Sequence, residues 1–248
     1  RGFLREGFSR RLLRLPSLGD EEVDWRDHDR YALLCEDWPG AAESARVAYR
    51  AAALRPVVCV VNGVPDSGKS TLAPRLAVEL GVPLLGKDLI KEAVADALDE
   101  SDQGRLSKEL GSGASRALWA LLATSPAGAV VESWLPPTRD TAYLVDGLRA
   151  AGLDPTAVPE VFCDVPPEVA RERDRLRAAK AERHPVHRGA VGEGEWRESV
   201  APAAYPVGVG PVLRVDTSQP VTDAQVCRLA LAIRAAATPT GSRYSAVI

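Results

Sequence analysis

One segment of the sequence has the residue types and spacing of a phosphate-binding loop. It matches the pattern GxxxxGK[ST] and consists of Gly63, Val64, Pro65, Asp66, Ser67, Gly68, Lys69, Ser70 and Thr71. The glycines let the backbone wrap around an anion, and the helix that follows adds N–H donors and partial positive charge. We expect Lys69 to bridge the β- and γ-phosphates of a nucleotide and the Ser70 hydroxyl to bind Mg²⁺.

Two carboxylates follow apolar runs that read as strands. Asp88 comes just after a short strand expected at residues 83–85, and Glu132 ends the run 129–131. Both are expected at the carboxyl edge of a parallel sheet, where ligands bind. Asp88 is a candidate to orient an acceptor hydroxyl and take its proton, or a helix N-cap. Glu132 is a candidate to bind Mg²⁺ through water or to hold the acceptor, or an exposed strand-end residue.

Basic residues gather on and just past a predicted helix, within a candidate lid at about 167–200. Guanidinium donors stabilise the charge on a phosphoryl group in transfer, so we expect Arg177 and Arg183 to take part in catalysis and Arg173 to bind the nucleotide. The alternative is a solvated helix whose arginines pair with interleaved acidic residues. His184 and His187 make an incomplete metal site and are interpreted as substrate-facing or structural residues of the lid.

The class of nucleotide-binding protein is narrowed by patterns that the sequence lacks. It has no NKxD-type segment for reading guanine, which argues against a GTPase, and no apolar strand ending in Asp-Glu, the pair that motor ATPases use to activate water. ATP is therefore the expected nucleotide. The segment 215–220 follows the last predicted strand and is either a border of the adenine site or a plain turn.

Short apolar strands alternate with longer helical patterns from residue 56 onward, which is typical of parallel βαβ units. Strands are predicted at residues 57–61, 83–85, 129–134, 157–165 and 212–215. Helices are predicted at residues 69–80, 89–98, 106–124, 138–151, 167–181 and 221–236. The β-branched run 57–61 is expected at the centre of the sheet, covered on both faces.

Composition places the chain among ordinary soluble proteins. Of its 248 residues 46% are hydrophobic and 26% are charged, and the net charge of -3 gives no overall attraction to nucleic acid or anionic membrane. No apolar stretch approaches the roughly 20 residues needed to span a bilayer, so we expect a cytoplasmic protein with no membrane partner. The four cysteines lack CxxC spacing and are expected to be reduced, with two of them in buried strands.

The expected organisation has three parts. Residues 1–55 form an N-terminal extension, an arm followed by a helix at 41–54; residues 56–237 form the main domain with its lid; residues 238–248 form a tail. Arg5, Arg10, Arg11 and Arg14 in the arm either contact a phosphate backbone or belong to a solvated arm packed on the main domain.

The chain resembles the small-molecule and nucleotide kinase branch of the P-loop superfamily, which includes gluconate kinase, chloramphenicol phosphotransferase, polynucleotide 5′-kinase, zeta-toxin-like proteins and bacterial predicted kinases of the AAA-family ATPases. The resemblance covers about residues 56–236. It is carried by the phosphate-binding loop and by segments 83–92, 130–133, 164–169, 182–187 and 215–217.

This resemblance implies a three-layer α/β sandwich, with a parallel five-stranded sheet in the order 2-3-1-4-5 and a helical lid carrying arginines. It also implies ATP at the loop and Asp88 near the acceptor. One departure is Asp66, where relatives more often have a small neutral residue; its carboxylate would weaken phosphate binding or assist the metal. Residues 192–211 match no pattern that assigns a substrate.

The leading hypothesis is transfer of the γ-phosphoryl group of Mg-ATP to a hydroxyl of a small molecule such as a sugar, a nucleoside or an antibiotic-like metabolite. One alternative is a polynucleotide 5′-hydroxyl kinase, with nucleic acid as its partner. Another is a regulatory switch that binds ATP and transfers nothing. The sequence indicates neither the acceptor nor the oligomeric state.

Overall fold

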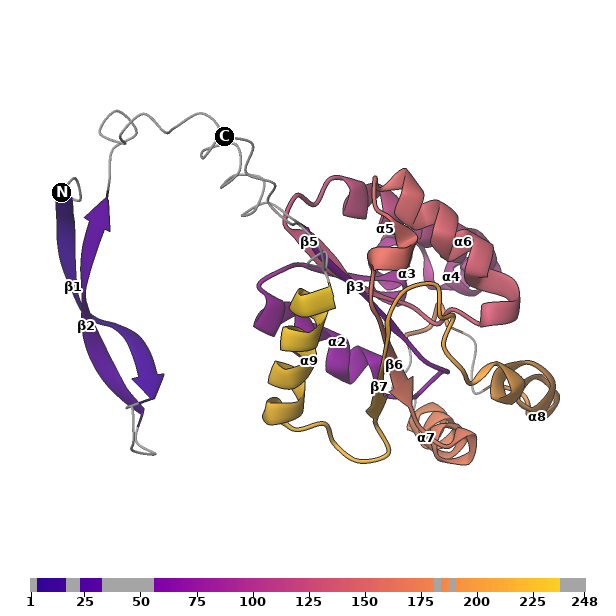
Figure 1. The fold of residues 1–248 in the computed structure, drawn as a ribbon. Helices are drawn as coiled ribbons and strands as arrows, with labels where there is room; N and C mark the ends of the chain where they lie inside the picture. Colours follow the sequence, from indigo (N-terminus) through magenta and orange to yellow (C-terminus); the bar gives the residue numbers. More distant parts are fainter. Residues whose placement is uncertain (1–3, 17–22, 33–55, 181–183, 188–190, 237–248) are drawn as a thin grey trace, which may run out of the picture. The chain divides into compact units, whose positions relative to one another are not determined.

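The computed structural model of the chain describes residues 4–16, 23–32, 56–180, 184–187 and 191–236. The chain forms two compact units, residues 1–54 and residues 55–248 (Figure 1). The second unit contains the predicted phosphate-binding loop and all the other candidate site residues. The candidate functional site therefore lies in the second unit.

The second unit is built on a five-stranded parallel sheet. Its strands are β3 (Val57–Asn62), β4 (Leu84–Gly86), β5 (Gly128–Glu132), β6 (Glu160–Asp164) and β7 (Val212–Asp216). They lie in the order β4-β5-β3-β6-β7. Numbered from the strand before the phosphate-binding loop, this is the order 2-3-1-4-5, so the predicted topology is confirmed.

Helices follow the strands and cover the sheet. They are α2 (Lys69–Leu80), α3 (Lys87–Ala95), α4 (Glu100–Arg105), α5 (Ser107–Ala123), α6 (Pro137–Ala150), α7 (Pro167–Ala179), α8 (Glu193–Glu195) and α9 (Asp223–Ala236). Figure 1 shows α2 and α9 on one side of the sheet and α5 and α6 on the other. The unit is therefore the three-layer sandwich that the sequence predicted.

The alternation of side chains along β3 explains why helices pack on both faces of the sheet. Cys59 and Val61 pack with α2 and α9 in one apolar cluster. Val58 and Val60 point the other way and pack with α5 and α6 in a second cluster. Because successive side chains of a strand point to opposite faces, a run of β-branched residues buries both faces at once.

A polar cluster at the end of β3 fixes the start of the phosphate-binding loop. The Asn62 amide nitrogen donates to Oε1 of Glu160 at 2.8 Å and to the Leu135 carbonyl at 3.1 Å. Its carbonyl oxygen accepts the N–H groups of Gly63 and Leu135. Asn62 is 1% exposed, so these bonds replace water in the interior. They join β3, β6 and the turn after β5.

Several boundaries differ from the sequence prediction. β6 begins at Glu160 rather than at residue 157, because residues 155–157 form a 3₁₀ turn. α4 was not predicted. Short helical turns occupy residues 193–203, where no helix was predicted: α8, a π turn at 196–200 and a 3₁₀ turn at 201–203.

Two cysteines lie in the core, as the sequence predicted. Cys59 on β3 and Cys163 on β6 are buried and unpaired. Burial raises the pKa of each thiol to about 12, so both stay protonated near neutral pH. Cys227 on α9 is free and exposed, and Cys35 lies outside the described residues.

The first unit contains an antiparallel pair of strands, β1 (Leu4–Pro16) and β2 (Val23–Ala32). The sequence predicted an arm here and did not indicate its strands, because basic and apolar residues are mixed along β1. The register is irregular between Arg5 and Gly7 and between Ser9 and Leu13. The predicted helix at 41–54 lies outside the described residues. Among the residues that the structure describes, no helix is long and apolar enough to cross a membrane.

The contact between α5 and α6 gives a test of the packing. A Cβ atom built on Gly147 of α6 would come within 2.1 Å of the Trp119 ring on α5. Gly147→Ala should therefore destabilise the fold by about 1–3 kcal/mol, although alanine is the better helix former. Unfolding in urea, followed by circular dichroism, measures the change.

Gly113→Ala is the matched control, because a Cβ there meets nothing within 4 Å. It should stabilise the fold by about 0.5–1 kcal/mol. An unchanged midpoint for Gly147→Ala would contradict the close approach of the two helices.

Candidate active site

The phosphate-binding loop, residues 63–68, connects the end of β3 to the start of α2. Gly68 occupies the N-cap position of α2 with φ 93°, a left-handed conformation that suits glycine. The helix has no side-chain cap bond and no acidic residue in its first turn. The N–H groups at this end are therefore not neutralised by the helix itself and can bind an anion.

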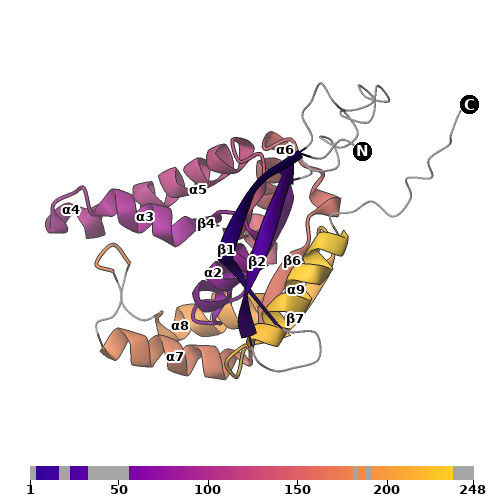
Figure 2. The ribbon, with the colours of Figure 1, turned by 90° about the vertical axis from the view of Figure 1, so that its left-hand side faces the viewer.

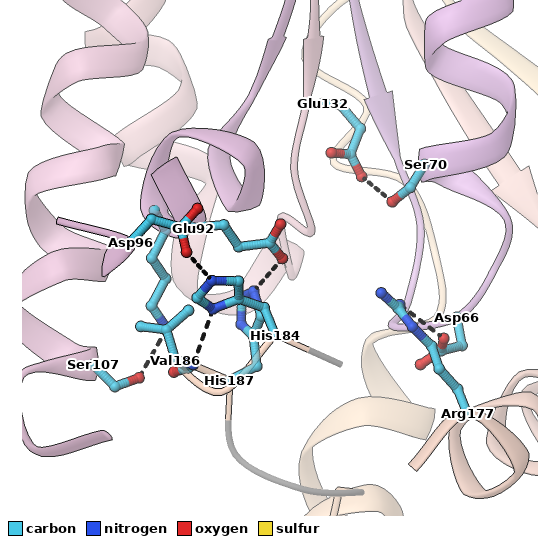
Figure 3. A network of polar contacts seen from close by, with 11 residues as sticks. Asp66, Ser70, Glu92, Asp96, Ser107, Glu132, Arg177, His184, Val186 and His187 are labelled. Atoms are coloured by element: carbon cyan, nitrogen blue, oxygen red, sulfur yellow. Dashed lines mark hydrogen bonds and ion pairs between the residues drawn. The ribbon is translucent and has the colours of Figure 1, made fainter. Parts of the chain in front are cut away.

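The first two residues of α2, directly after the loop, are Lys69 and Ser70. The buried Lys69 side chain crosses the loop, and its Nζ donates to the Val64 carbonyl at 2.7 Å. The Ser70 hydroxyl donates to Oε1 of Glu132 at 3.3 Å (Figure 3). The residues expected to contact phosphate and metal thus lie beside each other at the carboxyl edge of the sheet.

Glu132 is the last residue of β5 and lies between β3 and β4 in the sheet. Its side chain is only 6% exposed, so the interpretation as an exposed strand-end residue is wrong. Burial raises the pKa of this carboxyl, while the nearby charge of Lys69 lowers it and those of Asp88 and Glu92 raise it further. A buried carboxylate beside the loop lysine can serve as an oxygen ligand for a cation.

Asp88 lies in the first turn of α3, and its carboxyl group is exposed. Gly86 holds the N-cap position of this helix, and no side chain makes a cap hydrogen bond there. The alternative interpretation of Asp88 as an N-cap is therefore wrong, and its side chain remains available to a ligand.

These residues line one cavity of about 360 Å³. The candidate residues on its wall are Pro65, Asp66, Lys69, Ser70, Asp88, Glu132, Arg177 and His187. The predicted residues of the described part of the chain that do not line it are Gly63, Val64, Ser67, Gly68, Thr71, Arg173 and His184. A carboxylate of α3 thus faces the same space as an ammonium group and a hydroxyl at the start of α2.

The cavity also has polar and aromatic residues on its wall that the sequence analysis missed: Lys87, Glu92, Trp134 and Arg139. Glu92 follows Asp88 by four residues on α3, a spacing that places both on one helix face and could have revealed it. Trp134 follows the end of β5, and the Arg139 guanidinium lies 5.5 Å from its ring centroid. No sequence spacing indicates that contact, because the turn between β5 and α6 creates it.

Arg173 of α7 lies at a second, smaller cavity of about 180 Å³. Its Nη2 donates to the carbonyl oxygens of Thr217 and Ser218, at 2.9 and 2.8 Å. Gly68, Thr71 and Thr217 also line this space. Because Gly68 and Thr71 belong to the phosphate-binding motif, the second cavity lies beside the loop, next to the segment expected to border the adenine.

The other basic residues of α7 divide between two partners. Nη1 of Arg177 lies 3.4 Å from Oδ1 of Asp66 in the phosphate-binding loop. Arg171 and Arg175 instead pair with Glu193 of α8. Glu193 belongs to α8, so these pairs are not the ones with interleaved acidic residues that the solvated-helix interpretation predicted. Arg183 lies outside the described residues.

The two candidate histidines contact α3. Nε2 of His187 lies 2.8 Å from Oε1 of Glu92, and Nε2 of His184 lies 2.8 Å from Oδ1 of Asp96. His184 Nδ1 accepts the N–H of Val186, so in its neutral form the Nε2 carries the proton that Asp96 accepts. Figures 2 and 3 show residues 184–187 reaching α3 from the side of α7.

Residues 184–187 are also held in place by the burial of one of their side chains. Val186 is completely buried, and its carbonyl accepts from Nζ of Lys91 at 3.4 Å. Lys91 also donates to the Ser107 hydroxyl at 2.8 Å. The histidines therefore hold the segment against α3, and only His187 reaches the main cavity as well.

Comparison with solved structures found several proteins that are similar to this chain. A crystal structure of a candidate kinase from Chloroflexus aurantiacus J-10-fl superposes with a TM-score of 0.61 at 27% identity, over 73% of this chain and 98% of that one. A gluconokinase from Sinorhizobium meliloti 1021 matches with a TM-score of 0.46 at 23% identity, over 73% and 93% of the two chains. An unliganded sugar kinase from Janibacter sp. HTCC2649 gives 0.45 at 20%, over 73% and 98%.

The curated proteins contained no match to this chain. A family model described as an AAA domain matches residues 58–195, more than half of the sequence, and includes the phosphate-binding loop, Asp88, Glu132 and Arg177. The chain therefore belongs to the AAA-domain family of P-loop proteins, in its kinase-like branch.

Proposed function

We propose that this protein is a kinase that transfers the γ-phosphoryl group of Mg-ATP to a hydroxyl group of a small molecule. The observation that carries the proposal is the shared cavity, in which Lys69 and Ser70 of an uncapped helix face Asp88 and Glu132. Phosphoryl transfer needs little more than phosphate binding, charge neutralisation and a carboxylate near the acceptor. The similarity to the Chloroflexus aurantiacus protein supports the same class.

The loop and the smaller cavity suit a nucleotide. The N–H groups at the start of α2, where no side chain makes a cap bond, and the Lys69 ammonium would bind the phosphates. The space beside Arg173 and Thr217 would then hold the base, because Gly68 and Thr71 of the phosphate-binding motif line the same space. We place the kinase domain at residues 56–237, with its arginine-bearing segment at 167–200.

Ser70 and Glu132 suit Mg²⁺, which prefers oxygen ligands and usually combines one or two protein groups with phosphates and water. Their oxygens are 3.3 Å apart in the main cavity, beside the phosphate-binding loop. When bound, Mg²⁺ neutralises charge on the phosphate oxygens. Lys69 and Arg177 would supply the remaining positive charge around the transferred group.

Asp88 would orient the acceptor hydroxyl and accept its proton as the oxygen bonds to phosphorus. Its carboxyl group is exposed and makes no cap bond, so it is free to contact a ligand. The cavity volume of about 360 Å³ falls within the roughly 300–1,000 Å³ of small-molecule sites. A small metabolite is therefore a better fit than a long polymer, and Trp134 and His187 would help to enclose it.

Two substitutions separate a kinase from an ATP-binding switch. Lys69→Ala should lower Mg-ATP affinity at least tenfold and abolish ADP release, because it removes the charge that bridges the phosphates. Asp88→Asn should leave ATP affinity within about twofold and slow acceptor-dependent turnover by roughly 10²–10⁴-fold. ADP release is measured with sugars, nucleosides, phenolic and aminoglycoside alcohols and 5′-hydroxyl oligonucleotides.

Asp146→Asn, an exposed carboxylate of α6 away from the cavity, is the control and should behave like wild type. ATP binding with no acceptor response and no effect of Asp88→Asn would favour the switch. Turnover of oligonucleotides alone, with steep salt dependence, would favour the polynucleotide kinase.

Glu132→Gln should raise the melting temperature of the nucleotide-free protein at pH 7 while lowering its affinity for Mg²⁺. Because burial raises the pKa of Glu132, ionisation of this group is less favourable in the folded state than in the unfolded state. Protonated Glu132 therefore stabilises the folded wild-type protein at low pH. This stabilisation is lost as the pH rises through the raised pKa of Glu132. The advantage of glutamine should therefore vanish below the ordinary glutamate pKa of about 4.3.

Thermal unfolding from pH 4 to pH 8 without nucleotide measures this effect. Glu109→Gln, an exposed residue of α5, serves as the control. A lower melting temperature for Glu132→Gln at pH 7 would show that the carboxylate is stabilised by its neighbours rather than strained by burial.

A further inference from the structure

An ion pair joins the phosphate-binding loop to α7 across the main cavity. Oδ1 of Asp66 lies 3.4 Å from Nη1 of Arg177, and both residues line the cavity with Lys69 and Ser70. The side chain of Asp66 is only 8% exposed, whereas that of Arg177 is 46% exposed. Figure 3 shows the two groups directed toward each other from separate elements.

Aspartate is an unexpected residue at this position for two physical reasons. Its φ of 57° lies in the left-handed region, which glycine adopts without strain and aspartate adopts only at some cost. Its carboxylate also lies in a loop whose chemistry serves phosphate, and a like charge there opposes phosphate binding. The residue therefore does not serve nucleotide affinity.

We propose that Asp66 is a positioning residue that holds the Arg177 guanidinium toward the terminal phosphate of the bound nucleotide. This inference rests on the proposed kinase function. A guanidinium has five N–H donors in a rigid plane, so Nη1 can stay on Asp66 while donors on the other nitrogens reach a phosphate oxygen. The largely buried carboxylate is the fixed partner, and the half-exposed arginine is the one that it orients.

The expected effects on binding and on turnover have opposite signs. Removing the Asp66 charge relieves repulsion of the phosphates, so Mg-ATP should bind equally well or more tightly. The same change frees Arg177 from its fixed position, so stabilisation of the phosphoryl group in transfer should fall. A merely structural role would weaken binding and turnover together, and a simple phosphate-repelling role would leave turnover intact.

The test compares Asp66→Asn, Arg177→Gln and the double variant in the full chain. Asparagine keeps the shape of the side chain and tolerates the left-handed backbone. The Kd of Mg-ATP is measured by calorimetry, and the rate of ADP release is measured at saturating Mg-ATP, with an acceptor or as slow hydrolysis. Misplacing a catalytic group costs up to roughly a hundredfold, so we expect a tenfold or greater fall in rate for each single variant, with Kd unchanged or lower for Asp66→Asn.

The double variant should be no slower than Arg177→Gln alone, because Asp66 acts through Arg177. Arg175→Gln is the matched control: it removes one positive charge from the same helix, and Arg175 pairs with Glu193 outside the cavity. It should leave both Kd and rate near wild type.

Three results would overturn the inference: a wild-type or faster rate for Asp66→Asn, additive losses in the double variant, or a higher Mg²⁺ requirement for Asp66→Asn, which would make Asp66 a metal ligand. Failure of the proposed function would be seen separately, as Mg-ATP binding and ADP release that Lys69→Ala leaves intact. If Lys69→Ala abolishes both and Asp66→Asn behaves like wild type, only the positioning role fails.

Discussion

The burial of β3 on both faces is the constraint on which the rest of the structure depends. Its alternating side chains fill two apolar clusters, and its polar end residue Asn62 is held by bonds to Glu160 and Leu135. A strand fixed in this way delivers the loop that follows it to a defined place at the carboxyl edge of the sheet. β5 and β4, paired on the same side, deliver Glu132 and Asp88 to the same edge.

Much of the fold followed from local sequence signals. The β-branched run of β3, the phosphate-binding motif and the alternation of short strands with longer helices together specify a parallel sheet, because each level of pattern agrees with the others. The same signals identified Lys69, Ser70, Asp88 and Glu132, since the motif and the strand ends mark the ligand-binding edge. Element boundaries were less accurate, as at β6, which was predicted at 157–165 but begins only at Glu160, after a 3₁₀ turn at Pro155–Ala157.

The remaining features depend on contacts between distant residues. Asp66 and Arg177 are separated by 111 positions, and Glu92 and His187 by 95, so no spacing rule relates them. The sequence indicated that Asp66 was unusual but suggested repulsion or metal binding, because the arginine that faces it comes from α7. Likewise, the histidines were predicted as substrate-facing or structural residues of a lid, but their carboxylate partners, Glu92 of α3 and Asp96 at its end, emerge only from the tertiary fold.

The two bonds of Arg173 have a consequence for how this fold tolerates sequence change. Both end on backbone carbonyls, at Thr217 and Ser218, rather than on side chains. Every amino acid supplies a carbonyl, so the loop after β7 can exchange its side chains without losing this link to α7. Arg173 has no such freedom, because few other side chains reach two carbonyls with one nitrogen. The link itself therefore makes a demand on the arginine and none on the side chains of Thr217 and Ser218.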